Sequence, residues 1–212
     1  MELKKINKSP FTETKFLDLV KNLSNQNDFE ELKKGYYIDG GVLYNIGNRD
    51  YVDYRPSLKT TQKLLEKRGV TSLQLDSLTY QQVKELLDNK QYENVIIKKS
   101  DYSISLDLPS SYDLYLENLE KKKRHELKRK KSKFTKQLGE IELQSSNDLL
   151  MFEKFSEQHK LSDGKKGSFM NKEVELFFQN LLTIKGWKIY FIENESDLIS
   201  SVFVYENKKG CY

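Results

Sequence analysis

Hydrophobic residues in the first half of the chain recur with two different periods. Spacings of three and four residues predict amphipathic helices over residues 16–23, 57–69 and 79–88. Alternation of apolar and polar residues predicts strands over residues 36–46, 72–75, 94–97 and 102–108. We expect Gly40-Gly41 to break the first strand, and the helix at 79–88 to turn Tyr80, Val83, Leu86 and Leu87 inward. Helices and strands that alternate at this spacing predict an α/β fold, with helices flanking a mixed sheet.

The second half opens with one long helix. Ser110, with Asp113 three residues later, resembles a capping box and predicts its start, and Gly139 is placed to end it. Apolar residues recur along the helix at spacings of three, four or seven, interrupted by Lys123 and Lys131. We expect its leucines and phenylalanine to be buried, namely Leu116, Leu119, Leu127, Phe134 and Leu138.

Beyond this helix the pattern predicts a strand, two helices and a hairpin. The strand covers residues 140–144, and a helix over 147–161 is followed by a flexible polar loop over 162–168. The next helix begins at Asn171, a suitable N-cap, and closes at Gly186. A hairpin of residues 187–192 and 198–205 follows, and a third strand begins at Gly210. Because that strand stops at Tyr212, this second module reads as unfinished.

Positive charge is concentrated in the long helix. Residues 121–136 contain ten Lys or Arg and one acid, Glu126, which gives +9, whereas the whole chain carries +4. The rest of the chain is therefore mildly acidic. Either the lysines are solvated, with their aliphatic stems over the core, or the helix binds an anionic substrate or nucleic acid. The expected burial of the leucines favours a structural joint between two modules over a DNA-binding arm.

Several segments along the chain resemble one family. The run from Leu108 to Leu119, with Lys123-Arg124 and the basic residues up to Gly139, resembles the central segment of FemAB-like acetyltransferases of the GNAT superfamily. In that family a Leu-Pro-x-Ser segment enters a helix of the type Tyr-Leu-x-x-Leu, which an Arg and further basic residues follow. Other short segments typical of the family resemble Asp50–Asp53, Gln158–Lys160 and Gly167–Phe169. The resemblance therefore runs from about residue 50 to the C-terminus.

The resemblance implies three parts and a reaction. The parts are a GNAT-like α/β module over residues 1–107, a basic joint helix over 108–139, and the opening half of a second GNAT-like module over 140–212. The reaction is transfer of an acyl group from acyl-CoA to an amine acceptor. Without the long paired heptads of an inserted helical hairpin, acyl-CoA is favoured over aminoacyl-tRNA as donor. The resemblance puts the acyl-CoA site beyond Tyr212, so this chain is expected to be an inactive fragment of the acyltransferase unless it is extended.

Four residues are candidates for substrate binding: Arg124, Lys128, Arg129 and His159. His159 is also the candidate catalytic base, although its place four residues after Phe155 also fits a packed core residue. The carboxylates Glu193, Glu195 and Glu206 are alternative bases, and the sequence does not choose among them. No Cys and His residues have the spacing of metal ligands, so no metal is expected.

Hydropathy and the N-terminus bear on the compartment. No run approaches 18 apolar residues and no secretory signal is present, so we expect a cytoplasmic protein without a membrane span.

A second class of function stays open beside the enzyme: a non-catalytic module whose basic helix binds RNA or an acidic protein. The two classes differ in salt dependence, because polyanion binding weakens steeply as salt rises.

Overall fold

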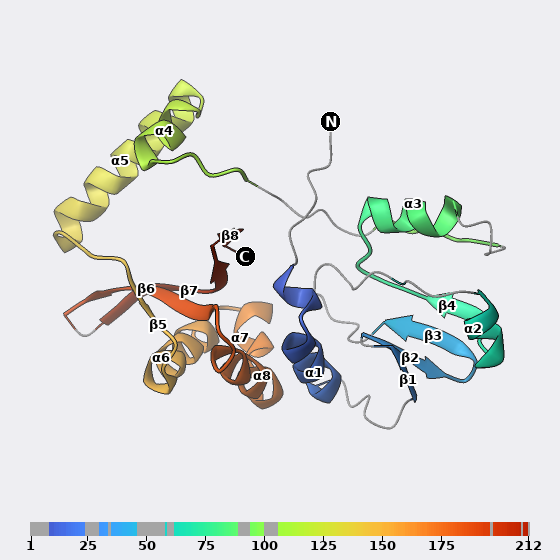
Figure 1. The fold of residues 1–212 in the computed structure, drawn as a ribbon. Helices are drawn as coiled ribbons and strands as arrows, with labels where there is room; N and C mark the ends of the chain where they lie inside the picture. The colour runs from blue at the N-terminus through green and yellow to red at the C-terminus, as the bar shows by residue number, and fades with distance from the viewer. Residues whose placement is uncertain are drawn as a thin grey trace.

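The computed structural model describes residues 9–23, 30–33, 35–45, 58, 62–88, 94–99, 106–195, 197–208 and 210–211. These residues form two four-stranded sheets with helices beside them, so the predicted mixed α/β class is confirmed (Figure 1). None of the helices in these ranges combines the length and the apolar character needed to cross a membrane.

The first sheet is built from strands that follow one another closely in the chain. In spatial order they are β1 (Glu30–Lys33), β2 (Tyr36–Asp39), β3 (Val42–Asn45) and β4 (Ser72–Gln74). The first three pair antiparallel, and β4 runs parallel to β3. The predicted break at Gly40-Gly41 is confirmed as the turn between β2 and β3, where both glycines have positive φ.

A small core and one buried amide hold this sheet together. Leu65 of α2 (Gln62–Lys67) is buried with Tyr36 and Leu43 of the sheet. Asn45, at the end of β3, is also buried, and its side chain satisfies both of its polar atoms on Asp76. Its Nδ2 donates to the Asp76 carbonyl at 2.8 Å, and its Oδ1 accepts from the Asp76 N–H at 3.1 Å. This pair of hydrogen bonds ties the end of β3 to the segment that follows β4.

The second sheet is antiparallel throughout. It consists of β5 (Gln144–Ser146), β6 (Trp187–Asn194), β7 (Asp197–Asn207) and β8 (Gly210–Cys211), in that spatial order. The predicted hairpin is confirmed as β6 and β7. Alternation along β6 buries Ile189 and Phe191 in the core, whereas Lys188 and Tyr190 lie on the opposite face of the sheet.

Two helices cover the apolar face of this sheet, and both were predicted. They are α6 (Leu149–Lys160) and α8 (Lys172–Leu182), with the short α7 (Lys165–Phe169) between them in the chain. Phe152 and Val174 belong to the same buried cluster as the strand residues. The predicted N-cap Asn171 is confirmed, because its Oδ1 accepts the Val174 N–H at 3.0 Å.

The N-terminal helix packs into the core of the second half of the chain. A 3₁₀ turn, η1 (Pro10–Thr12), leads into α1 (Thr14–Leu23), which confirms the amphipathic helix predicted here. Phe16 is buried against Phe177 of α8 and stacks on Trp187, with ring centroids 6.0 Å apart for the second pair. The division of the chain at residues 107 and 139 stays a prediction, and the contact of α1 with α8 crosses both boundaries.

Some predicted elements are wrong. Residues 94–97 form no strand, and Val95, Ile96 and Ile97 are exposed. The helix α3 (Tyr80–Asp88) exists, but none of its residues is buried and Tyr80 is 75% exposed. Apolar spacing reports which residues share a face, and it does not report whether another element covers that face.

Other differences concern the limits of elements. The strand predicted from residue 140 begins at Gln144, and the loop predicted at 162–168 contains the helix α7. Residues 106–108, the end of another predicted strand, are not in a strand. Residue 57, where the helix over 57–69 was predicted to begin, and residues 102–105 lie outside the described residues.

The predicted long helix is two helices. α4 (Tyr112–Glu117) and α5 (Lys121–Leu138) are separated by a turn at Asn118–Glu120. Ser111, and not Ser110, caps α4, because its Oγ accepts the Leu114 N–H at 3.2 Å. Glu120 has extended backbone angles, which end the helical path and let α4 lie back along α5. Gly139 ends α5 as predicted.

Candidate functional site

The helix α5 presents ten cations to its surroundings and has no buried side chain. In Figure 1 it is a rod that projects away from both sheets, with α4 beside it. The predicted burial is confirmed for Leu116 of α4, which is 4% exposed. The prediction of burial is wrong for the other apolar residues of the predicted long helix, which are only half-buried: Leu119, Leu127, Phe134 and Leu138. The leucines therefore do not make α5 a core helix, and its charge needs another explanation.

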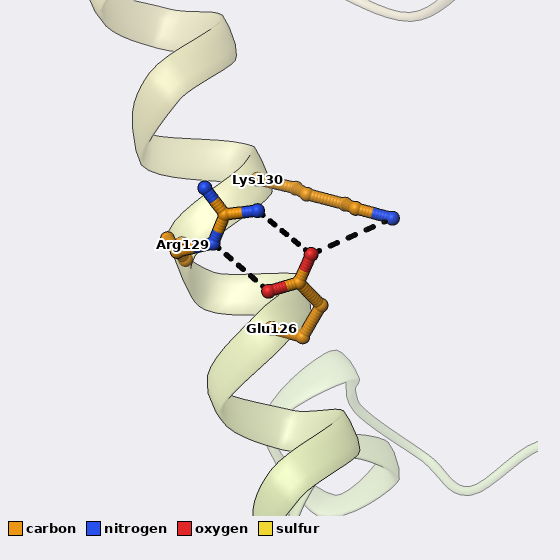
Figure 2. A network of polar contacts seen from close by, with 3 residues as sticks. All are labelled: Glu126, Arg129 and Lys130. Atoms are coloured by element: carbon orange, nitrogen blue, oxygen red, sulfur yellow. Dashed lines mark hydrogen bonds and ion pairs between the residues drawn. The ribbon is translucent and has the colours of Figure 1, made fainter.

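Glu126 neutralises part of this charge. Both of its oxygens accept hydrogen bonds from Arg129, from Nε and Nη2, each at 2.8 Å. Lys130 Nζ lies 3.7 Å from Oε1 of the same carboxylate (Figure 2). The bidentate contact with Arg129 lowers the pKa of Glu126 to about 2 and raises the pKa of Arg129. These pairs at i+3 and i+4 occupy one side of α5.

A different side of α5 faces α4, and an open groove of about 490 Å³ lies between the two helices. The residues that line it on both helices are Tyr112, Asp113, Leu116, Lys128, Lys131, Ser132, Thr135 and Lys136. The α5 members follow the spacing i, i+3, i+4, i+7 and i+8, which places them on one face of the helix. Lys131 Nζ lies 5.2 Å from the centroid of the Tyr112 ring, so a cation–π contact bridges the helices.

The three substrate-binding residues predicted on α5 have different surroundings. Arg124 is half-buried and donates from Nη1 to the Glu117 carbonyl at 3.3 Å, which links the two helices across their turn. Arg129 is held by Glu126. Lys128 lines the groove, and it forms no ion pair with any carboxylate that the structure describes. Of the three, Lys128 is the one placed to meet a ligand in the groove.

His159 lies elsewhere, near the end of α6. Its ring is between those of Phe155 and Phe169, with centroids 6.2 and 5.9 Å away. Its Nδ1 is buried and has no hydrogen-bond partner among the described residues. These surroundings agree with the packed alternative, and the role of His159 as a base stays a prediction.

The face of the second sheet opposite α6 and α8 carries a polar cluster that the sequence did not reveal. Glu206 Oε2 accepts from Lys188 Nζ at 2.8 Å and from the Tyr190 hydroxyl at 2.7 Å. These contacts lower the pKa of Glu206 and raise the pKa of Lys188 and of Tyr190. Alternation along β6 places Lys188 and Tyr190 on one face, but only the pairing of β6 with β7 brings Glu206 to them.

The other alternative bases are occupied or exposed. Glu193 forms an ion pair with Lys154 at 2.6 Å, and Glu195 is exposed in the turn after β6. In the described part of the chain, no group of three or more His, Cys, Asp or Glu residues is placed to hold a metal ion.

Protein-family models, curated protein sequences and solved structures were all compared with this chain, and none of them matches it.

Proposed function

We propose that this protein is an N-acyltransferase of the FemAB-like, GNAT-superfamily kind, which transfers an acyl group from acyl-CoA to an amine. The observation that carries the proposal is the order of elements after α5. A strand, two covering helices, a hairpin and a fourth antiparallel strand follow one another from β5 to β8. This is the order that the hydrophobic pattern predicts for residues 140–212, the range that the resemblance assigns to the opening half of a second GNAT-like module.

The segment before β5 supports the same proposal. The Leu-Pro-Ser-Ser-Tyr entry at residues 108–112 leads into α4, and the basic run follows on α5. Lys128 contributes positive charge for an anionic group of the substrate, since it lines the groove without a described carboxylate partner. Arg124 and Arg129 hold the shape and charge balance of the α4–α5 pair through their contacts with Glu117 and Glu126.

The reaction exchanges the thioester bond of acyl-CoA for an amide bond. The amine nitrogen attacks the acyl carbonyl carbon, a C–N bond forms, and the C–S bond to CoA breaks. The amine loses a proton to a base, and the CoA thiolate is protonated as it leaves. His159 is the candidate base, and its Nδ1 is buried without a hydrogen-bond partner among the described residues.

Calorimetry with acetyl-CoA tests this proposal on the full protein that the gene encodes. We expect saturable binding of acetyl-CoA and, with a suitable amine, release of free CoA thiol. If His159 is the base, His159→Gln lowers kcat and leaves the affinity for acetyl-CoA unchanged. An absence of both binding and thiol release across a panel of amines would contradict the transfer reaction.

A second candidate function is favoured by one observation, the lack of any buried side chain on α5. We propose as the alternative that α5 binds RNA without catalysis. Fluorescence anisotropy with a single-stranded RNA oligonucleotide is the test, and affinity is expected to fall about a hundredfold or more between about 50 and 200 mM salt. Replacing Lys128, Arg129 and Lys130 by Gln should lower the affinity for the RNA oligonucleotide further. Affinity that changes with neither salt nor these substitutions would exclude this alternative.

A further inference from the structure

The residues that line the groove between α4 and α5 indicate the chemical class of a ligand for it. We propose that this groove binds a small molecule that carries linked phosphate groups. The inference goes beyond the transfer reaction and stands whether or not that reaction occurs.

Charge is the first argument. Lys128, Lys131 and Lys136 line the groove together with a single carboxylate, Asp113, which leaves a net charge of +2. None of the three lysines forms an ion pair with a described carboxylate, whereas Arg129 and Lys130 share Glu126 on another side of the helix. The groove therefore brings together three lysines that have no described carboxylate partner, and an anionic ligand supplies one.

Spacing is the second argument. Lys128 and Lys136 are eight residues apart, which is about 12 Å along a helix axis, and Lys131 lies between them. Three ammonium groups spread over this length suit two or more linked phosphates better than a single small anion. Lysine binds phosphate as a compact point charge with three donors, which fits this arrangement.

The polar groups between the lysines are the third argument. Thr135 already donates its hydroxyl to the Lys131 carbonyl at 3.1 Å. The Ser132 hydroxyl has no hydrogen-bond partner among the described residues, so it is available to donate to a phosphate oxygen. Asp113 accepts hydrogen bonds but repels phosphate, so the ligand carries a hydroxyl or amino group beside its phosphates.

Size favours a small molecule over a nucleic-acid strand. A volume of about 490 Å³ is within the range of small-molecule sites, about 300–1,000 Å³. The Tyr112 ring that borders the groove already contacts Lys131 and stacks with Tyr115, so it is not a free platform for successive bases. A long polyanion would follow the exposed length of α5 and would use all of its cations equally.

Two matched variants test the proposal on residues 1–212. The first replaces the groove lysines, Lys128→Gln, Lys131→Gln and Lys136→Gln. The second replaces three lysines on the other side of α5, Lys122→Gln, Lys130→Gln and Lys133→Gln, and removes the same charge. Circular dichroism checks that both keep the helix content of the parent, and calorimetry with inorganic pyrophosphate measures binding.

We expect the groove variant to lose affinity for pyrophosphate by about tenfold or more, and the control variant to change it much less. Chemical shifts of Tyr112 and Ser132 should move on titration of the parent protein. Equal losses in both variants would show diffuse attraction to α5 and would overturn the groove as a site, as would an absence of pyrophosphate binding by the parent. Acetyl-CoA itself carries a pyrophosphate and would also enter the groove, so release of free CoA thiol, and not acetyl-CoA binding, tests the transfer reaction separately.

Discussion

Two glycines, Gly139 at the end of α5 and Gly186 in the turn before β6, show how a single backbone position constrains this fold. The helix predicted to close at Gly186 ends earlier, since α8 stops at Leu182. Gly186 and Gly139 both have positive φ, 105° and 81°, which side chains with a Cβ adopt only at a cost. A Cβ on Gly186 would lie 2.6 Å from Cε2 of Tyr205 and 3.0 Å from the Glu206 carbonyl oxygen. A Cβ on Gly139 would meet no atom within 4 Å. The two positions therefore separate backbone strain from a steric clash.

We predict that Gly139→Ala destabilises the fold by about 1–3 kcal/mol, the usual cost of a strained backbone angle. Gly186→Ala should cost more, because the new methyl group also displaces the Tyr205 ring or the β7 backbone. Urea unfolding of the two variants measures the difference. Equal midpoints for the two variants would contradict the clash at Gly186.

Glu126 is the residue whose protonation should matter most for α5. Its pKa is lowered to about 2, chiefly by the hydrogen bonds from Arg129, from an ordinary value of 4.5. Because the pKa is depressed in the folded helix, its stabilising contribution is fully present above about pH 4.5 and is lost as pH falls through about 2.

We therefore predict that the side-chain carboxyl carbon of Glu126 titrates with a midpoint near pH 2 in an NMR experiment at low salt. High salt should raise this midpoint toward the ordinary value, because the pair is exposed and screened. Arg129→Gln should raise it as well, since the bidentate donor is removed. A midpoint near 4.5 in the parent at low salt would mean that the contact does not persist in solution.

At the scale of single elements, helix starts depend on side chains that replace missing backbone partners. Asn171 caps α8, and its Oδ1 accepts the Val174 N–H, which has no partner inside the helix. Asn171→Ala should cost about 1 kcal/mol of stability. Asn147→Ala is a matched control, because Asn147 is exposed and its side chain makes no hydrogen bond among the described residues. Thermal unfolding compares the two, and equal Tm values would argue against the cap.

The element α5 differs from α6 and α8 in what stabilises it. Helices α6 and α8 bury apolar faces against β6 and β7. Helix α5 buries no side chain, and its stabilising contacts are those with α4 and its local ion pairs. Its first turn also carries Lys121, Lys122 and Lys123, which the helix dipole disfavours. An anion beside this first turn would offset that cost, whereas the groove lysines lie farther along the helix.

At the scale of the whole molecule, the N-terminal helix joins the second half of the chain. Phe16 lies in a cluster with Phe177 and Trp187, and it is only 2% exposed. The sequence contains a single tryptophan, so all tryptophan fluorescence comes from Trp187 in this cluster.

We predict that Phe16→Ala destabilises the protein by about 3–5 kcal/mol, because a buried aromatic ring is lost. The Trp187 emission should also shift to longer wavelength, because water then reaches the indole ring. Tyr80→Ala is the control, since Tyr80 is 75% exposed and its removal should change stability by about 0.5 kcal/mol or less. Unchanged emission in Phe16→Ala would show that α1 does not pack on Trp187 in solution.

The elements of the second half could be predicted from the sequence because their signals are local. Apolar spacing on α6 and α8, the cap at Asn171 and the alternation of β6 each lie within one segment, and the structure confirms all of them. The same local reasoning found the basic run and placed Lys128 on it. It also assigned the class, since helices and strands alternate along the chain.

Which faces are covered could not be predicted, because that depends on segments far apart in the chain. The leucines of α5 and the apolar residues of α3 have helical spacing, yet no layer buries them. The turn at Asn118–Glu120 brings α4 back to α5 and creates the groove, and the pairing of β6 with β7 brings Glu206 to Tyr190. The sequence by itself therefore determined the α/β class, most elements of the second half and the position of the charge. Tertiary packing alone decided where that charge meets a cavity, because burial is a property of contacts between elements.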